Sequence, residues 1–268
     1  MDLIDQKKRF DKNWQKFSPL FGTKAWEENP NFLYFVEIPL PTSLWTEMEQ
    51  LTNLLKKQNP GAKGLWFRAQ RMHITIALPG RLGEHFQGND INFMTKKLQE
   101  ISQKTAPFTV SLGNINCFAD VLFREVYDLD NSLQSLHEEI CKKIPFSQNP
   151  AYQFDNFIPH ISLFLGQGTQ TLFSHNDFSR ELDSSPLTID RLFFGRARND
   201  EGKYEKTILQ EFPLQKTHNQ KRQPQKIQTR KKSVSIDLSS PLKTRGKKSC
   251  GSTTTTALRG IYCSIYKN

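Results

Sequence analysis

The sequence predicts an α+β domain built from two similar halves and followed by a basic C-terminal tail. The order strand, helix, loop, strand occurs twice, ending at residues 71–78 and again at 158–165. The expected strands are short apolar runs rich in β-branched and aromatic residues, whereas the expected helices repeat apolar residues every three to four positions. The formal net charge is +10, but residues 216–268 hold 13 Lys and Arg against one acid, so the body is close to neutral.

The first half begins after an N-terminal arm, residues 1–30, which we expect to form a short amphipathic helix and a loop that pack on the body. A strand is predicted over residues 31–39, where the run Phe-Leu-Tyr-Phe-Val-Glu-Ile ends at two prolines. Ser43 is predicted to cap a helix that ends at Asn59-Pro60-Gly61. Residues 65–67 then lead into the strand at 71–78.

The second half has the same plan. A helix is predicted over residues 91–102, followed by strands at 108–112, 117–119 and 121–126. The next helix is capped by Asn131 or Ser132, and His137 is expected on its surface. The strand at 158–165 follows, then a short helix or turn at 178–182. Strands at 187–195 and 204–212 form a closing hairpin around the turn at 199–202.

Two short segments have the same pattern of a histidine and a hydroxyl. His73-Ile74-Thr75 lies in the first apolar run and His160-Ile161-Ser162 in the second, 87 residues later. Side chains alternate between the two faces of a strand, so each histidine shares a face with its hydroxyl residue while the isoleucine points the other way. A single histidine in a strand is usually an ordinary structural residue. The chain has only six histidines, however, and two of them in one repeated pattern favour a functional site.

Two imidazoles that face one groove are suited to acid–base chemistry. An unperturbed histidine titrates near neutral pH, so one ring accepts a proton from an attacking water or hydroxyl while the other gives one to the leaving oxygen. Hydroxyl groups donate hydrogen bonds to the non-bridging oxygens of a phosphate. This combination indicates phosphodiester cleavage, and we expect it to need no metal or cofactor.

These paired segments resemble the signatures of the two-histidine (2H) phosphoesterase superfamily. That superfamily includes the bacterial 2′-5′ RNA ligase-like proteins, cyclic nucleotide phosphodiesterases and 2′,5′-phosphodiesterases. The resemblance covers roughly residues 30–215, including the C-terminal hairpin. It implies a bilobal α+β fold with a pseudo-two-fold axis, in which two antiparallel-rich sheets surround a central groove with helices outside. Each lobe then carries one signature, and both histidines face the groove.

The functional hypothesis is a metal-independent phosphodiesterase that acts on an RNA-like or cyclic nucleotide, at a 2′,3′-cyclic phosphate or a 2′-5′ linkage. His73 and His160 are its acid and base in either order, and Thr75 and Ser162 hold the phosphate oxygens. Two alternatives stay open. One is a non-catalytic nucleotide- or RNA-binding module that uses the same groove, and the other is ligation of RNA ends, which needs the same acid and base.

Four further residues are candidates for substrate binding. Arg71 precedes His73 by two positions and shares its face if the strand has begun there; a cation at that place binds phosphate. Arg196 lies beside the hairpin turn and is a second possible phosphate contact. Tyr204 and Phe157 are aromatic residues that stack a base if they line the groove. For each of them an ordinary packing or surface role is the alternative.

The rest of the composition bounds the setting. The four cysteines, Cys117, Cys141, Cys250 and Cys263, form no CxxC pair, which favours reduced thiols without a metal. No apolar run is long enough to span a membrane and no signal peptide is evident, so we expect a cytoplasmic protein, or a nuclear one if the tail acts as an address. The predicted domain is residues 31–215. Residues 216–268, basic and rich in Ser and Thr, are predicted to be disordered and able to contact nucleic acid or an acidic surface.

Overall fold

The computed structural model describes residues 2–17, 21, 29–144, 157–166, 186–200 and 203–215. Four α-helices lie in this part of the chain: α1 (Leu3–Phe17), α2 (Trp45–Gln58), α3 (Gly88–Ser102) and α4 (Ser132–Lys143). Two 3-10 turns, η2 (Thr42–Leu44) and η3 (Ala69–Arg71), precede α2 and the third strand. The strands are β1 (Asn29–Pro39), β2 (Gly64–Trp66), β3 (His73–Arg81), β4 (Phe108–Cys117), β5 (Val121–Asp128), β6 (His160–Gly166), β7 (Pro186–Ile189), β8 (Arg191–Asp200) and β9 (Lys203–Pro213).

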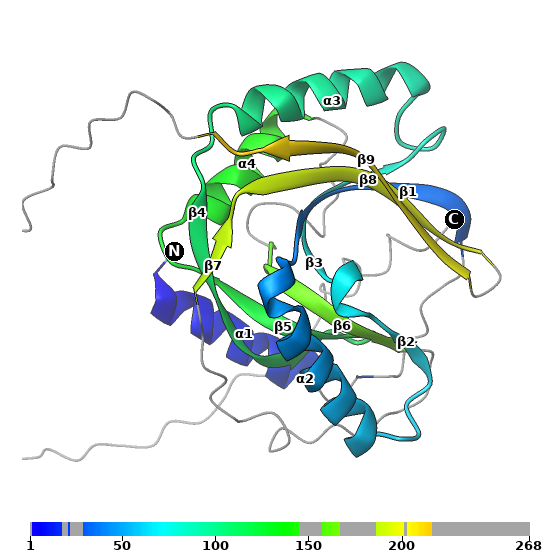
Figure 1. Ribbon diagram of the computed structural model, residues 1–268, viewed down its shortest axis with the longest axis vertical. Helices are drawn as coiled ribbons and strands as arrows, with labels where there is room; N and C mark the ends of the chain where they lie inside the picture. The colour runs from blue at the N-terminus through cyan, green and yellow to red at the C-terminus, as the bar shows by residue number, and fades with distance from the viewer. Residues whose placement is uncertain are drawn as a thin grey trace, which may run out of the picture.

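These nine strands form one antiparallel sheet in the order β7-β4-β5-β6-β3-β1-β8-β9, with β2 paired to β6. The expected fold class is confirmed, but the two expected sheets are joined into one. The join is narrow, because β3 and β6 share a single registered pair, Ile74 opposite Ile161. On either side of that pair the sheet divides into a first half, β3-β1-β8-β9, and a second half, β7-β4-β5-β6-β2. In Figure 1 the first half arches over the top and the second crosses below it.

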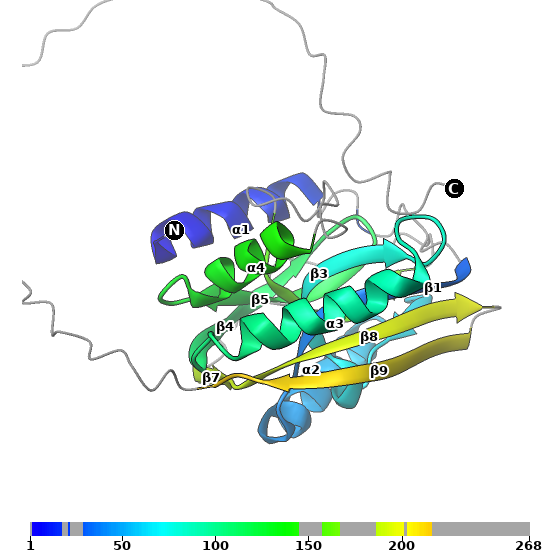
Figure 2. The ribbon, with the colours of Figure 1, turned by 90° about the horizontal axis from the view of Figure 1, so that it is seen from above.

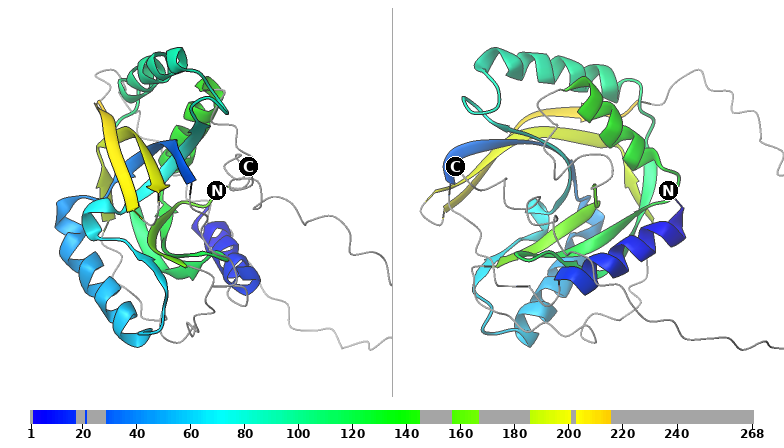
Figure 3. Two further views of the ribbon diagram at one scale, coloured as in Figure 1. Left: turned by 90° about the vertical axis from the view of Figure 1, so that its right-hand side faces the viewer. Right: turned by 180° about the vertical axis from the view of Figure 1, so that it is seen from behind.

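Helices cover the two halves from different sides. In the first half α3 contacts β8 and β9 and α4 contacts β3, and α4 also contacts β4 and β5 of the second half. In the view from above, α3 and α4 lie on the same side of the β8–β9 hairpin (Figure 2). In the second half α2 approaches one face, where Arg124 of β5 pairs with Glu47, while α1 packs on the other, where Phe10 meets Phe123. The two views in Figure 3 show α1 and α2 on different sides of the second half.

The N-terminal helix α1 packs against the body through polar as well as apolar contacts. Its buried residues, Gln6, Phe10, Asn13 and Phe17, follow the spacing of one helical face. The Gln6 side chain donates to the Asp128 carbonyl (2.7 Å) and accepts from the Asp128 amide (2.9 Å), so it acts like a short added strand at the end of β5. Asn13 donates to the Asn116 side chain and the Cys117 carbonyl.

Three local predictions are corrected by the structure. Ser43 does not cap α2: residues 42–44 form η2, and α2 begins at Trp45 with no side-chain cap. In place of the strands expected at 108–112 and 117–119 there is one strand, β4, which ends at Cys117; its pairing with β5 continues past a register irregularity between Leu112 and Ile115. His137 is buried on α4, where its Nδ1 lies 2.7 Å from the Ile76 carbonyl.

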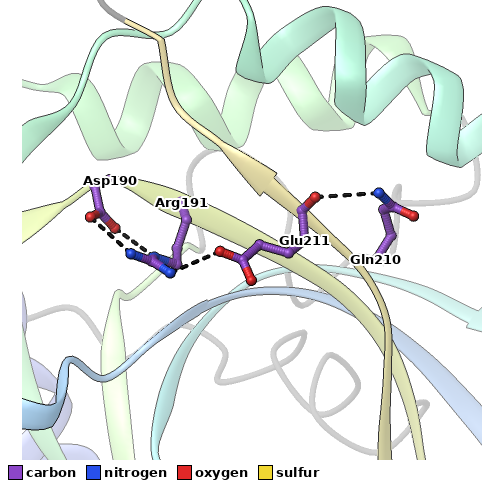
Figure 4. Close-up of polar contacts among 4 residues, drawn as sticks. All are labelled: Asp190, Arg191, Gln210 and Glu211. Atoms are coloured by element: carbon purple, nitrogen blue, oxygen red, sulfur yellow. Dashed lines mark hydrogen bonds and ion pairs between the residues drawn. The ribbon is translucent and has the colours of Figure 1, made fainter.

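The strand expected at 187–195 is two strands that lie in different halves of the sheet. β7 pairs with β4 in the second half, and β8 pairs with β1 and β9 in the first. The chain changes halves at Asp190, whose carbonyl accepts from Leu214. Figure 4 shows the Arg191 guanidinium held between the carboxylates of Asp190 and Glu211 at this corner. The alternation changes phase at this point, since Leu187 and Ile189 are buried in β7 and Leu192 and Phe194 in β8, with the exposed residues Asp190 and Arg191 between them.

The short helix predicted at 178–182 and the basic tail at 216–268 lie outside the described residues. Within the described part, no helix is long and apolar enough to cross a membrane.

Candidate active site

The two histidine–hydroxyl pairs meet where the halves of the sheet join. Ile74 and Ile161 are opposite each other and fully buried on one face, so His73 and Thr75 of β3, and His160 and Ser162 of β6, project from the other face. If the antiparallel register of the Ile74–Ile161 pair is extended by one residue in each direction, His73 lies beside Ser162 and Thr75 lies beside His160. The local two-fold axis therefore passes through the isoleucine pair, and each histidine is next to the hydroxyl residue of the opposite half.

Both imidazoles are fixed in the same way. Nδ1 of His73 lies 2.8 Å from the Arg71 carbonyl, and Nδ1 of His160 lies 2.8 Å from the Ile158 carbonyl. A carbonyl oxygen only accepts, so each Nδ1 carries the hydrogen. In the neutral form Nε2 is then the free basic nitrogen of both rings, which is the tautomer that general acid–base chemistry at Nε2 requires.

An ion pair that the sequence analysis missed lies against His73. Lys206 of β9 donates to Oε1 of Glu37 on β1 at 2.7 Å, and the two side chains are only 12% and 2% exposed. The other carboxylate oxygen, Glu37 Oε2, is 3.4 Å from His73 Nε2 and has no hydrogen-bond partner among the described residues. Lys206 Nζ is also 3.3 Å from His73 Nδ1. Since that nitrogen already donates to a carbonyl, this is a contact between two donors and raises the cost of charging the ring.

These neighbours act on the pKa of His73 in opposite directions. Burial lowers the pKa of His73, the nearby Glu37 carboxylate raises it, and the Lys206 ammonium lowers it, with a net lowering. Because Glu37 Oε2 has no donor among the described residues, a proton on Nε2 of His73 is the charge that this carboxylate is placed to stabilise.

His160 has a different environment. The pKa of His160 is lowered to about 4, mainly by burial and to a smaller extent by the His73 ring as a second potential positive charge. Its ring lies among aromatic side chains, with centroids 5.2 Å from Phe118 and 4.9 Å from Phe123. Phe118 and Phe123 in turn contact Phe17 and Phe10 of α1. His160 is thus neutral at physiological pH, with an apolar surround to which the N-terminal helix contributes.

The strand next to each histidine repeats the residues Phe-x-Glu. In the first half Phe35 stacks near His73 at 6.2 Å, and Glu37 follows two residues later. In the second half Phe123 contacts His160, and Glu125 follows and pairs in register with His160. The two carboxylates differ in their partners. Burial raises the pKa of Glu125, whose oxygens accept from the Asn116 side chain, the Tyr127 hydroxyl and the Asn114 amide.

The predicted substrate-binding residues divide into those near the histidines and those away from them. Arg71 does not lie in β3, since it ends η3 and the strand begins at His73, so the alternation argument for its side chain fails. Its guanidinium is nevertheless close enough to Lys206 to lower the pKa of that ammonium. Tyr204 lies in β9 opposite Asn199, and its side chain is outside the described part of the structure.

Arg196 and Phe157 are not brought to the histidines. Arg196 pairs with Tyr34 on β1, whose side chain belongs to the main core, and its guanidinium lies 4.2 Å from the Phe32 ring centre. Phe35 follows Tyr34 in β1 and points to the face that carries His73. Tyr34 and its partner Arg196 therefore lie on the opposite face of the sheet. Phe157 is 2% exposed and stacks on buried His137 at 4.0 Å, which leaves its ring no open face for a base.

The described residues also bear on metal and thiol chemistry. Cys117 and Cys141 are buried free thiols, and burial raises the pKa of Cys117 to about 12 and that of Cys141 to about 11. Within the described ranges, no group of three or more His, Cys, Asp or Glu side chains is arranged to hold a metal ion.

Comparison with known proteins places this geometry in context. The model of a family described as the 2′-5′ RNA ligase superfamily matches residues 40–201, a range that contains both histidine–hydroxyl pairs. An RNA 2′,3′-cyclic phosphodiesterase of Aquifex aeolicus (strain VF5) is 29% identical over 105 residues, which are 37% of this chain and 54% of that protein. The chain thus matches about half the length of this curated relative.

Solved structures share the fold. The crystal structure of E. coli LigT complexed with NADP+ superposes with a TM-score of 0.53 at 18% identity and covers 69% of this chain and 98% of LigT. The crystal structure of TT0787 from Thermus thermophilus gives a TM-score of 0.53 at 15% identity, with coverage of 68% and 97%. LigT has also been crystallised with 3′-AMP, and that structure superposes with a TM-score of 0.53.

Proposed function

The chain belongs to the 2′-5′ RNA ligase superfamily, and from this membership and the geometry of its two histidines we propose that it is a phosphodiesterase that cleaves an RNA 2′,3′-cyclic phosphate or a 2′-5′ linkage. The observation that carries the proposal is the symmetric meeting of the two histidine–hydroxyl pairs about Ile74 and Ile161. The curated relative from Aquifex, an RNA 2′,3′-cyclic phosphodiesterase, supports the cyclic phosphate as the first substrate to test.

In the proposed reaction His160 is the base and His73 is the acid. His160 is the better candidate for the base because its lowered pKa keeps Nε2 unprotonated at neutral pH. It takes a proton from a water molecule whose oxygen forms a new bond to phosphorus. His73 Nε2 gives its proton to the leaving ribose oxygen as the P–O bond breaks. At 3.4 Å from Glu37 Oε2, this proton is stabilised but remains free to be donated.

Thr75 and Ser162 complete the site. Each lies two residues after a histidine and on the same face, so both hydroxyls lie next to the reacting phosphate. Each donates a hydrogen bond to a non-bridging oxygen as negative charge develops there. In this scheme the two histidines make both proton transfers and no metal ion takes part in them.

The test is turnover in EDTA of three substrate types: 2′,3′-cyclic nucleotides, 2′-5′ oligoadenylate and 3′-5′ RNA ends. Wild type is compared with His73→Ala and His160→Ala, each expected to lose about 10² to 10⁴ in kcat. His85→Ala is the matched control, because this histidine is half exposed in the turn after β3.

Three outcomes would count against the proposal. Turnover that requires a divalent ion contradicts the two-histidine mechanism. Turnover that survives both alanine substitutions means that the catalytic residues are not these two histidines. Nucleotide binding without turnover of any of these substrates by wild type makes the groove a binding module.

A further inference from the structure

A pocket beside His73 remains unassigned by the reaction described above. It has a volume of about 400 Å³ and is lined by Leu65, Trp66, Phe67, Arg68 and Arg71. This volume is within the range of about 300–1,000 Å³ that small-molecule sites occupy. The lining is a short aromatic and apolar segment with two arginines, and the described residues that line it include no acid.

The pocket is joined to the candidate active site through Arg71. The carbonyl of Arg71 accepts the hydrogen bond that orients His73, and the same residue lines the pocket. Arg71 also lies close enough to Lys206 to lower the pKa of that ammonium. A substrate phosphate bound at His73 would therefore lie near Lys206 and Arg71, and Arg71 is also part of the pocket wall.

The fold holds the aromatic wall in place. β2 and β3 share one edge of β6, so residues 67–72 form the bridge between them. Trp66 is opposite Phe164 in that ladder, with ring centroids 4.4 Å apart, and Phe67 donates its amide to the Leu163 carbonyl. Trp66 is partly exposed, and Lys56 Nζ lies 5.8 Å from its ring centre, which adds a third positive charge nearby.

A flat aromatic side chain with arginines around it has the composition of a site for a nucleotide. Base stacking on an aromatic ring is tolerant of sequence, and arginine matches the geometry of a phosphodiester oxygen pair. Trp66 supplies the stacking surface, and Arg68 and Arg71 supply the phosphate contacts. Both arginines are exposed to solvent rather than buried.

We propose that this pocket binds the penultimate nucleotide of the substrate, the one joined to the 5′ side of the terminal nucleotide that carries the scissile phosphate, which makes the protein selective for oligonucleotides over mononucleotides. This inference rests on the proposed function, since it assigns a role relative to the phosphate held by the two histidines. The base of the additional nucleotide stacks on Trp66, and the phosphodiester that joins it to the terminal nucleotide lies against Arg68 and Arg71.

The experiment compares kcat/KM for the dinucleotide ApA carrying a 2′,3′-cyclic phosphate with kcat/KM for adenosine 2′,3′-cyclic phosphate. Wild type is expected to prefer the dinucleotide at least about tenfold, through KM. Arg68→Ala should reduce this ratio about tenfold or more, as the loss of a charge-assisted contact to phosphate predicts. Trp66→Leu should reduce it as well, and Arg191→Ala, which removes an arginine at the distant corner shown in Figure 4, should leave the ratio unchanged.

The results separate the two proposals. Equal use of both substrates by wild type, or a ratio that Arg68→Ala leaves in place, overturns the pocket assignment while the phosphodiesterase stands. Turnover of neither substrate overturns the proposed function. In that case the affinity for ApA, measured by isothermal titration calorimetry, decides the pocket: weaker binding by Arg68→Ala than by Arg191→Ala supports it, and equal binding overturns it.

Discussion

Replacement of Glu37 by glutamine tests how the two histidines divide their work. Glu37→Gln keeps the shape and the contact with Lys206 but removes the negative charge 3.4 Å from His73 Nε2. Coulomb's law gives about 1 kcal/mol for two unit charges at this distance in water and about 5 kcal/mol at an effective dielectric of about 20. One pKa unit corresponds to about 1.4 kcal/mol, so we expect the pKa of His73 to fall by at least about one further unit.

The expected change appears in the pH dependence of kcat/KM. In the free enzyme His160 must be unprotonated and His73 protonated, so activity rises with pH through about 4 and falls as pH passes the lowered pKa of His73. Glu37→Gln should move only the falling limb, toward lower pH. Lys206→Gln removes the charge that lowers the pKa of His73 and should move the same limb to higher pH.

Two measurements check this prediction together. The pKa of each imidazole is followed by NMR titration of the histidine ring nitrogens, and the limbs of the kcat/KM profile are followed with a 2′,3′-cyclic nucleotide. Removal of one partner from a buried ion pair costs roughly 3–5 kcal/mol of folding free energy, so both variants need to be shown folded at the assay temperature. Limbs that stay fixed in Glu37→Gln, or a shift of the rising limb instead, would refute the assignment of His73 as the acid.

Three other predictions concern the hydroxyls, the stability of the site and the N-terminal helix. Thr75→Val and Ser162→Ala should each lower kcat by about 10- to 1,000-fold with little change in KM, because their hydrogen bonds strengthen as charge develops; a change confined to KM would contradict this role. His160 has a folded pKa of about 4 against an unfolded value of 6.5, so its contribution to stability is complete above pH 6.5 and is lost as pH falls toward 4. This contribution amounts to about 3 kcal/mol. The free energy of unfolding of His160→Gln, measured by urea denaturation at the two ends of this pH window, should therefore change less with pH than that of wild type. Phe10→Ala should cost about 3–5 kcal/mol and Asn13→Ala about 1–3 kcal/mol in chemical denaturation, whereas Lys12→Ala on the exposed face of α1 should change stability by less than about 0.5 kcal/mol.

Much of the fold was predictable because the two halves carry strong and repeated local patterns. The paired histidine strands, the helices after β1 and β5 and the closing hairpin all follow the periodicity of their apolar residues. Boundaries failed where a neighbour in space decided them. In residues 187–195 the adjacent polar residues Asp190 and Arg191 interrupt the apolar alternation, but the sequence does not show that the chain leaves β4 for β1 there, since the partner of each strand is set by tertiary structure.

Local patterns also predicted only those features of the candidate site that depend on neighbours in sequence. Alternation in a strand places Thr75 with His73 and Ser162 with His160, and the repeat brings the pairs together. Contacts between distant strands could not be obtained that way, so Lys206, 133 residues after His73, was missed. One signal was available: Phe35-Val36-Glu37-Ile38 and Phe123-Arg124-Glu125-Val126 match in the strand preceding each histidine. A search for that second repeat would have singled out Glu37.

The repeat also explains why two equivalent histidines are expected to act differently. Backbone carbonyls fix Nδ1 in both rings at the same distance, so both rings are held in the same tautomer. The proposed distinction comes from the aromatic surround that buries His160 and lowers its pKa, and from the carboxylate beside each ring. Glu125 is engaged by an amide, a hydroxyl and a backbone donor, whereas Glu37 has one oxygen held by Lys206 and one directed at His73. Within the proposed mechanism, the burial of His160 and the unequal hydrogen bonding of the two matched acids favour proton donation by His73 and proton abstraction by His160.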